Sequence, residues 1–489
     1  MKNRTSRKWI VERLGFSVPF VCAGVICLSL LACVKPSIPL AQDSGAVPWD
    51  AVEKETVEHL QALIRFDTSN PPGNETAAAE YLKKVLEREG IPAKLLALDP
   101  KRANLVARIK GNGSKKPILI MGHTDVVGVQ KDKWSVDPFG GVRKDGYIWG
   151  RGALDDKDNV TAGLMVMLLL KRQNIVLDRD VIFLAEAGEE GFDKEGLRHV
   201  AANHWDEIDA EFAIAEGGGG VVRGGKAQFL TVATTEKVPR GVQLIARGTS
   251  GHGSVPLQDN AVVRLAGAVA RVGAWMPPMR LNETTRSYFE RLAQISPPEE
   301  SARYRSILIR EEQAAVEKYF AQKEPRHNSM LRTSISPTIL KGGFRSNVIP
   351  SDAEAYLDIR ALPDEDMPAF VKRLEEIIGD PKVEIKPNPW RPAAPSSKLG
   401  TDMFTALEKA QKRIFPEAVT LPTLLTGATD MYQLRVKGVQ AYGIGPLIEE
   451  KEMARGGGVH GNDERILEKS LHDFVRFIWL TVLEVAAKK

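Results

Sequence analysis

Runs of apolar residues alternate with amphipathic stretches over the first half of the chain. A helix, a Pro/Gly turn and a second amphipathic helix are predicted over residues 52–90. Further along, the expected strands are residues 104–109, 117–122, 180–188 and 210–217, and the expected helices are residues 159–173 and 195–205. Such alternation predicts an α/β domain with a mainly parallel sheet, in which ligands bind where the strands end.

The hydrophobic pattern changes after Lys237. Residues 241–248 alternate like a half-exposed strand, residues 259–275 have helical periodicity, and residues 353–362 are strand-like again. We therefore expect a smaller inserted α+β domain that interrupts the catalytic domain. The predicted boundaries are 43–238 for the first catalytic part, 239–361 for the inserted domain with a charged helical insertion at about 277–332, and 362–489 for the second catalytic part.

The first 42 residues have the layout of an export signal, with a basic start, the apolar run FSVPFVCAGVICLSLLAC and a polar end. We expect an exported protein of the periplasm or cell envelope. Lipidation at Cys33, simple cleavage near Ala41 and an uncleaved membrane anchor all stay open. All three cysteines, Cys22, Cys27 and Cys33, lie here, so the remaining chain has no thiol for a disulfide or a metal.

Composition and charge narrow the function classes. The chain has 489 residues, of which 43% are hydrophobic and 27% charged, as in ordinary globular proteins. Its net charge is +4, but the first 41 residues carry six basic residues and one acidic residue, so the remainder is close to neutral. No electrostatic basis for nucleic-acid binding remains.

Several potential metal ligands follow the predicted strands or lie in nearby loops. No cysteine is among them, and two histidines combined with several carboxylates suit a hydrolytic site for zinc or a similar divalent ion. These residues are His123 with Asp125, Asp155, the pair Glu189 and Glu190, Glu216, and His460.

Each residue type has a chemical reason to be present. One carboxylate can bridge two metals about 3.5 to 4 Å apart, with one imidazole and one further carboxylate on each ion. Asp125 stands two residues beyond His123, where alternate strand residues share a face, so that it can orient the imidazole. Glu189, next to a ligand Glu190, can accept the proton of the attacking water.

Eight motifs together resemble those of a known family. In chain order they are GHTDVV, WSVDPF, YIWGRGALDDK, GEEG, SGHGSVP, SNVIPSDAEAYLDIR, TGATD and GVHGNDE. Their order and extent resemble the zinc metallopeptidase family that includes aminoacylase, glutamate carboxypeptidase, succinyl-diaminopimelate desuccinylase and carboxypeptidase S. The motif GRGALDDK, followed by the helix predicted to begin at Asn159, resembles the carboxypeptidase S branch of this family most.

The resemblance implies a role for each ligand and a fold with a catalytic domain and an inserted lid or dimerisation domain. Asp155 would bridge two Zn²⁺ ions, with Co²⁺ or Mn²⁺ as alternatives. His123 and Glu216 would complete one ion's protein ligands, and Glu190 with His460 the other's. Glu189 would be the general base and Asp125 the partner of His123.

The resemblance also implies residues that hold the substrate. His252 would stabilise the oxyanion, in family members from the partner subunit of a homodimer. Asn347 and Arg360 would hold the substrate, with Arg360 on its carboxylate, and Gly427 and Thr429 would shape the substrate-binding wall. The residues alone leave other interpretations open, because His252, Gly427 and Thr429 also suit turns and Arg360 suits an ion pair with Asp358.

The leading hypothesis is an exported dinuclear-zinc peptidase or amidohydrolase that cleaves a peptide or N-acyl amide bond beside a free carboxylate, as a carboxypeptidase or dipeptidase does. The alternative is an aminoacylase type, which acts on N-acyl amino acids, because the metals and the base serve any amide bond. A more remote alternative is an inactive exported binding protein on the same scaffold. It is disfavoured because all five ligand positions and the base position are filled.

Overall fold

The computed structural model describes residues 47–191, 194–389, 391–454 and 458–489. The export signal predicted over residues 1–42 lies outside these described residues, so it stays a prediction. Within the described part of the chain, every helix is too short or too polar to cross a membrane.

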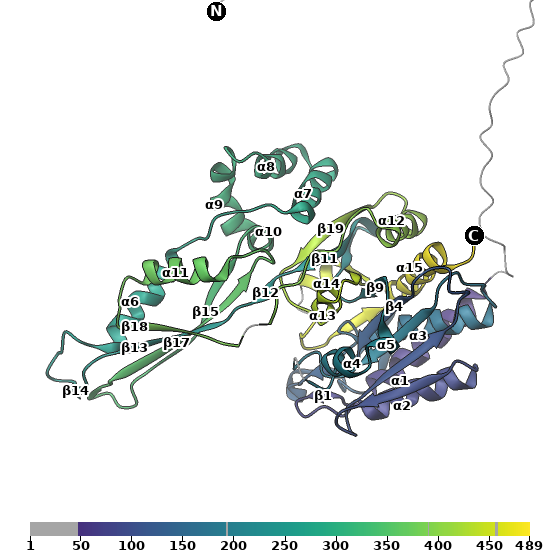
Figure 1. Cartoon of the computed structure of the whole chain (residues 1–489), viewed down its shortest axis with the longest axis horizontal. Helices are drawn as coiled ribbons and strands as arrows, with labels where there is room; N and C mark the ends of the chain where they lie inside the picture. The colour runs from purple at the N-terminus through teal and green to yellow at the C-terminus, as the bar shows by residue number, and fades with distance from the viewer. Residues whose placement is uncertain (1–46, 192–193, 390, 455–457) are drawn as a thin grey trace, which may run out of the picture. The chain divides into compact units, whose positions relative to one another are not determined.

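A ten-stranded sheet, called the catalytic sheet below, organises the first and last parts of the chain (Figure 1). Five of its nine strand pairings are parallel, including both pairings of β4. The strand order is β2 (Ala93–Ala97), β3 (Ala103–Ile109), β8 (Val181–Glu186), β4 (Ile118–His123), β9 (Phe212–Ala215), β20 (Gln440–Gly443), β11 (Lys226–Glu236), β10 (Gly219–Arg223) and β21 (Leu447–Glu449), and β19 (Val419–Leu425) also pairs with β11.

Helices cover both faces of the catalytic sheet. One face packs on α1 (Trp49–Ile64), α2 (Thr76–Arg88), α3 (Lys157–Arg172), α12 (Asp402–Ile414) and α15 (Glu468–Ala486), and the other on α4 (Leu197–Asn203), α5 (Trp205–Ile208) and α13 (Met431–Val436). Strands β4, β8 and β9 are buried over their whole length, which explains their continuous apolar sequences. The predicted α/β class is confirmed.

A second, antiparallel sheet follows residue 237. Its order is β12 (Val238–Pro239), β17 (Asp352–Ala361), β13 (Val242–Arg247) and β18 (Val383–Pro387), and β15 (Ser334–Gly342) also pairs with β17. The apolar sides of α6 (Ala261–Ala274) and α11 (Met367–Ile378) share one core with this sheet. This inserted α+β unit is the one expected from the change in pattern.

The predicted end of the inserted domain at residue 361 is too early. Strand β18 pairs with β13 over five residues, and Phe370, Leu374 and Ile378 of α11 are buried in the core of the second sheet. Both elements follow residue 361 in sequence, so the chain stays with the second sheet until about Pro387. Their amphipathic patterns fit either domain, and only the pairing with β13 assigns them.

The charged insertion over 277–332 forms α7 (Glu283–Ile295), α8 (Pro298–Leu308), α9 (Gln313–Lys323) and α10 (Pro325–Met330), together called the helical insertion below. Its core contains Phe289 and Phe320 and extends onto Leu421 of β19 and Phe229 of β11. The helical insertion was expected as part of the inserted domain by its sequence position. It packs instead on strands of the catalytic sheet.

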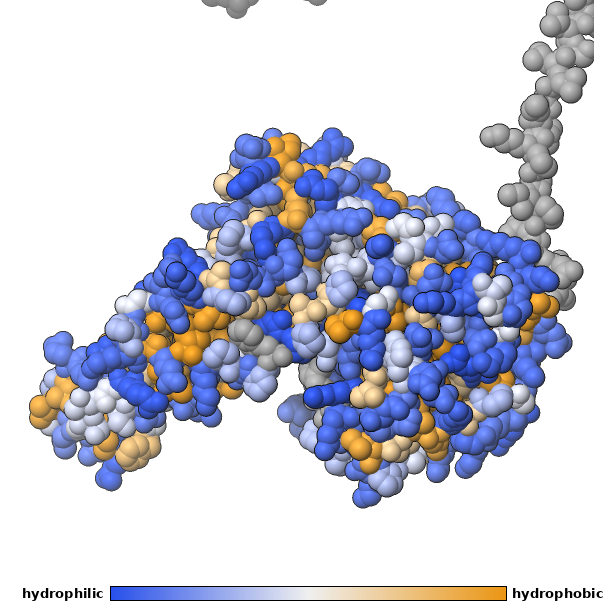
Figure 2. Space-filling model, in the orientation of Figure 1, coloured by the Kyte–Doolittle hydropathy of each residue, from blue (hydrophilic) through white to orange (hydrophobic). Residues whose placement is uncertain are grey.

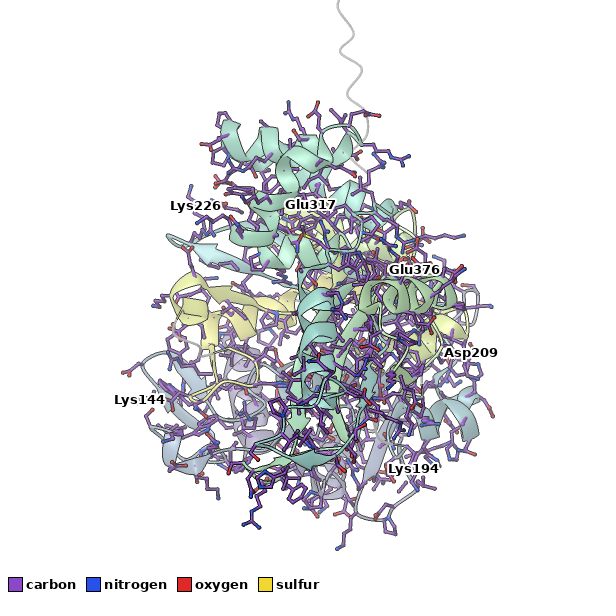
Figure 3. All side chains as sticks on the ribbon, turned by 90° about the vertical axis from the view of Figure 1, so that its left-hand side faces the viewer. Lys144, Lys194, Asp209, Lys226, Glu317 and Glu376 are labelled. Carbon is purple, nitrogen blue, oxygen red and sulfur yellow. The ribbon has the colours of Figure 1, made fainter. Side chains whose placement is uncertain are left out.

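Charged and polar side chains predominate on one face of the molecule (Figure 2). The face drawn in Figure 2 is mostly hydrophilic, and its apolar residues lie in separate patches. Charged residues such as Lys226 and Glu317 extend from the strands and helices in Figure 3. This agrees with the ordinary charged content of the sequence.

Candidate metal centre

Three neighbouring strands deliver candidate ligands to one edge of the catalytic sheet. Strand β4 runs parallel to both β8 and β9, so the carboxyl ends of the three strands meet at the same edge. His123 ends β4, Glu189 and Glu190 follow β8, and Glu216 follows β9. The buried strand therefore places the His123 imidazole at the edge where ligands bind.

Two loops bring the remaining ligands to this edge. Asp155 precedes α3, and His460 precedes β22 (Arg465–Leu467). Strand β22 pairs with β7 (Tyr147–Trp149), which in turn pairs with β6 (Val142–Lys144) and leads into the Asp155 loop. This small sheet holds two segments together that lie about 300 residues apart in the sequence.

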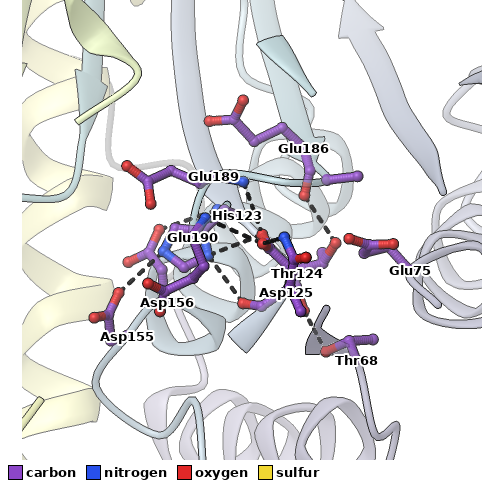
Figure 4. Close-up of polar contacts among 12 residues, drawn as sticks. Thr68, Glu75, His123, Thr124, Asp125, Asp155, Asp156, Glu186, Glu189 and Glu190 are labelled. Carbon is purple, nitrogen blue, oxygen red and sulfur yellow. Dashed lines mark hydrogen bonds and ion pairs between the residues drawn. The ribbon is translucent and has the colours of Figure 1, made fainter. Parts of the chain in front are cut away.

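The Asp155 carboxylate lies between the two imidazoles. Its Oδ1 is 3.0 Å from Nε2 of His123, and its Oδ2 is 3.0 Å from Nε2 of His460. The same His460 nitrogen is 3.0 Å from Oε1 of Glu190. Figure 4 shows Asp155, Glu190 and His123 converging in this way. One carboxylate with an imidazole at each oxygen has the arrangement of a bridging ligand.

The two adjacent glutamates point to different partners. Glu190 contacts His460, whereas Glu189 forms a second group with His123 and Glu216, in which one ligand atom of each residue lies within 4.8 Å of the others. His123, Asp155 and Glu190 form another such group. Two overlapping groups of potential metal ligands are therefore present, and His123 belongs to both.

Asp125 fixes the geometry around His123. The Nδ1 atom of His123 lies 3.0 Å from the backbone oxygen of Asp125 and 3.4 Å from its Oδ1. The backbone N–H groups of Glu189 and Glu190 donate to the Asp125 carboxylate, both at 3.1 Å, and Asn70 Nδ2 donates at 2.9 Å. An Nδ1–H that faces Asp125 leaves Nε2 free to face Asp155. One carboxylate thus orients three of the candidate site residues.

Other acidic residues support the centre, and the sequence interpretation gave them no role. Glu464 accepts hydrogen bonds from Leu154 N at 2.8 Å and from Arg151, which fixes the loop before Asp155. Asp156 accepts from the backbone N–H of His123 at 3.1 Å. The motifs could have drawn attention to both residues, because Glu464 ends the GVHGNDE motif and Asp156 follows Asp155. No pattern along the chain, however, shows which backbone groups these carboxylates bind.

Burial and mutual repulsion shape the electrostatics of the centre. Burial raises the pKa of Glu189 and Glu216 well above the usual range, and neighbouring carboxylates raise both further. Hydrogen bonds to Asp155 and Glu190 raise the pKa of His460 to about 10. Burial also raises the pKa of Asp155, but its hydrogen bonds with His123 and His460 outweigh this effect and lower it. Such a crowd of buried carboxylates around two imidazoles is the donor set that fits divalent cations.

The candidates His252 and Asn347 lie at a separate two-stranded sheet, and no contact of either with the metal ligands is found among the described residues. Strand β14 (Gly251–His252) pairs with β16 (Val348–Ile349), and Gly253 N donates to Asn347 O at 2.8 Å. His252 Nδ1 accepts from the backbone N–H of Ser254 at 3.1 Å. Residues 250–256 and 346–349 are called the tip of the second sheet below. The tip brings His252 and Asn347 together.

Arg360 and Thr429 already have protein partners. Arg360 Nε donates to Asp358 Oδ1 at 2.9 Å, the ion pair that the sequence left open as an alternative. The Thr429 hydroxyl donates at 2.8 Å to the buried carboxylate of Glu236, which also binds Arg435. Gly427 is half-buried, with little beside it. The structural interpretation is therefore favoured for Thr429, whose hydroxyl is used within the fold.

Comparisons with known proteins agree with this geometry. The model of peptidase family M20/M25/M40 matches residues 119–484. The N-fatty-acyl-amino acid synthase/hydrolase PM20D1 of Homo sapiens is 27% identical over 90% of both chains, and the probable carboxypeptidase S-like 2 of Dictyostelium discoideum is 30% identical over 77% of this chain and 73% of its own. The M20 family metallo-carboxypeptidase Sso-CP2 from Sulfolobus solfataricus shares the fold with a TM-score of 0.66, at 19% identity over 88% of this chain and 99% of its own. The chain therefore belongs to peptidase family M20/M25/M40 and is a metal-dependent hydrolase of peptide or amide bonds.

Proposed function

We propose that the protein is a dinuclear-zinc hydrolase that cleaves a peptide or N-acyl amide bond beside a free carboxylate. The observation that carries this proposal is the Asp155 carboxylate, which has one imidazole at 3.0 Å from each of its oxygens. Imidazole and carboxylate ligands without a thiolate suit zinc, and cobalt or manganese can take its place.

We assign His123 and Glu216 to one ion, Glu190 and His460 to the other, and Asp155 to both. The contact between Glu190 and His460 supports the second pair, and the group that His123 and Glu216 form with Glu189 supports the first. The other group, His123 with Asp155 and Glu190, fits the position of Asp155 between the two pairs. Two divalent ions held here would polarise the amide carbonyl and make water acidic enough to attack at neutral pH.

Glu189 is the proposed general base. It is buried beside His123 and Glu216, and its backbone is fixed by Asp125. Glu189 accepts a proton from the attacking water as the C–O bond forms, and it then donates that proton to the amine nitrogen as the C–N bond breaks. The products are a carboxylic acid and a free amine.

The substrate is proposed to be held by residues from the second sheet. Arg360 would exchange its pairing with Asp358 for the substrate carboxylate, which matches its planar guanidinium. His252 and Asn347 lie together at the tip and contact none of the ligands within the described part of the chain. We therefore propose that His252 serves the site of a partner subunit in a homodimer.

The scissile bond is proposed to be a peptide bond, with N-acyl amino acids as the second candidate. Both are supported by relatives, one named carboxypeptidase S-like and the other N-fatty-acyl-amino acid synthase/hydrolase. The experiment is a hydrolysis screen of the full-length, metal-loaded protein on dipeptides, their C-terminal amides and N-acyl amino acids. Turnover of the acids after metal loading, and none after chelation, supports the proposal, whereas hydrolysis of neither class would refute it.

Export to the cell envelope is also a proposal, supported by the basic and apolar layout of residues 1–42. Fractionation of cells that express the full-length chain tests export directly. Lipidation at Cys33 predicts that Cys33→Ser loses a metabolic fatty-acid label. An unlabelled wild-type chain would leave simple cleavage near Ala41 and an uncleaved membrane anchor, and the mass of the mature chain separates these two.

A further inference from the structure

A cavity of about 390 Å³ lies between the helical insertion and the catalytic sheet. This volume is within the range of roughly 300 to 1,000 Å³ that is typical of small-molecule sites. Helices α7 and α10 lie beside β11 and β19 in Figure 1, and they form one wall. The residues that matter for its chemistry are Val221, Phe229, Thr231, Tyr288, His327 and Ile448.

The cavity is close to the metal centre along the chain. Gly218, which lines it, is two residues beyond the ligand Glu216, so their Cα atoms are at most about 7.6 Å apart. Ile444 N donates to Ala215 O, and the segment after it supplies Pro446 and Ile448 to the cavity wall. The same pair of strands that presents Glu216 therefore continues into the cavity.

Three polar side chains of the cavity wall, Tyr288, His327 and Glu324, bind one another, whereas Arg326 of the same wall is exposed. Tyr288 Oη and His327 Nε2 are 2.9 Å apart, and the other ring nitrogen of His327 pairs with Glu324. The hydroxyl of Thr231 donates to Gly219 O at 2.8 Å. Because these groups are already paired, an apolar group can cover them without leaving buried polar atoms unsatisfied. The wall therefore suits an apolar ligand.

The wall is also rigid. The Tyr288 and Phe289 ring centroids are 5.1 Å apart, and those of Phe289 and His327 are 5.3 Å apart. Phe289 is fully buried in the core of the helical insertion, which holds these rings in place. A preformed aromatic wall lowers the entropic cost of binding.

We infer that this cavity receives the apolar acyl group on the carbonyl side of the scissile amide, and this inference rests on the second candidate of the proposed function, an N-acyl amino acid. The opposite, carboxylate-bearing side of the substrate is assigned above to Arg360 of the second sheet. The cavity walls come from the catalytic sheet, next to Glu216, and from the helical insertion. Straight-chain and aromatic acyl groups are the ligand class that its lining fits.

Binding of straight-chain carboxylic acids from acetate to octanoate tests the inference by calorimetry on the full-length, metal-loaded protein. These acids are the acyl products of hydrolysis and are not consumed. Affinity should rise by about fourfold for each methylene that becomes buried, until the cavity is filled. Equal affinity for acetate and octanoate would overturn the inference.

Two variants of Val221 should change the longest acid that the cavity can hold, in opposite directions. Val221 is half-exposed on β10 and lines the cavity, so Val221→Trp should weaken octanoate binding by about tenfold or more and change acetate binding by less than about twofold. Val221→Ala should extend the gain to longer acids. The matched control is Lys226→Trp, which adds the same side chain on the neighbouring strand, at an exposed position outside the cavity. Equal losses in Val221→Trp and Lys226→Trp would overturn the inference.

Measurements of turnover can distinguish a failure of the cavity assignment from a failure of the proposed function. The kcat/KM values for N-acetyl and N-octanoyl amino acids should follow the same order in the wild type and in the Val221 variants. Hydrolysis that ignores acyl length, with octanoate bound no better than acetate, would refute the cavity assignment and leave the proposed function intact. Length-dependent binding without any hydrolysis would refute the proposed function and leave the cavity only as a binding site for apolar chains.

Discussion

The metal centre and the tip of the second sheet differ in how their residues meet. In the metal centre, strand order alone brings His123, Glu190 and Glu216 to one edge, because β4 lies between β8 and β9. At the tip, a two-residue strand pair joins His252 to the Asn347 segment, and their described contacts are with each other's loops. A set of motifs can therefore be complete in one chain while its parts act in different places. The residues of the metal centre come together within one subunit, whereas His252 of the tip is proposed to act in the site of a partner subunit.

The largest effect is expected within the metal centre, where it separates two adjacent residues. Glu189→Gln keeps the shape of the side chain but cannot accept a proton, so turnover should fall by about 10²- to 10⁴-fold while both metals stay bound. Glu190→Gln should lose metal at one site, because a neutral amide is a poorer ligand for a dication. Metal analysis and kinetics on both variants decide the assignment. Metal loss in Glu189→Gln with retention in Glu190→Gln would reverse the two roles.

The second-largest effect is expected at the tip, where it tests whether His252 acts in the site of a partner subunit. His252→Ala should lower turnover by about 10²- to 10³-fold, as loss of an oxyanion donor does, without changing metal content. Mixed dimers of His252→Ala and Glu189→Gln subunits then contain one site with both groups intact. Random mixing should restore roughly a quarter of wild-type activity. No recovery in verified mixed dimers would show that His252 does not serve the partner's site.

A smaller and substrate-selective effect is expected at Arg360. Its loss should lower activity on substrates with a free carboxylate by about tenfold more than on the matching amides, because a charge-assisted bond to the carboxylate is lost. Asp358→Asn is the control, since it removes the ion-pair partner of Arg360 and leaves the guanidinium. Equal losses on acids and amides in Arg360→Ala would make Arg360 a structural residue paired with Asp358.

The smallest effect concerns stability at the junction of the two sheets. Lys237 lies between β11 and β12, and its Nζ donates to Ser329 Oγ at 3.0 Å and to Ser334 Oγ at 2.9 Å. Burial, together with Arg360 and Arg332, lowers its pKa to about 7, whereas an unfolded lysine has a pKa of about 10.4. Below pH 7 the buried Lys237 is charged, which lowers the stability of the native state. Above pH 7 the native state loses this proton while the unfolded chain keeps it, so the free energy of unfolding rises until about pH 10.

Lys237→Met has no such charge, so its gain in free energy of unfolding over the wild type should be larger at pH 6 than at pH 9. The difference should be about 1–2 kcal/mol. Denaturant titrations of both proteins at the two pH values measure it. A difference between variant and wild type that does not depend on pH would contradict the proposed charge state of Lys237.

The sequence predicted four of the ten strands of the catalytic sheet, β3, β4, β8 and β9, and the gathering of the ligands at their ends, because apolar runs that end in His123 or Glu216 carry both signals locally. Three features escaped it for a physical reason. The contact of Glu464 with Leu154 spans 310 residues, and that of Thr429 with Glu236 spans 193, so no local pattern reports them. The assignment of β18 to the second sheet depends on its pairing with β13, since an amphipathic strand fits either sheet. Patterns along the chain show what a segment buries, but not which distant partner buries it.

The central claim is that Asp155 bridges two metal ions that catalysis requires. Metal analysis of the purified full-length protein, paired with activity before and after chelation, tests it most directly. We predict close to two divalent ions per chain in the wild type. Chelation should abolish its activity, and zinc, cobalt or manganese should restore it. The Asp155→Asn variant should lose both ions or their cooperative binding. A fully active, metal-free preparation would contradict the account.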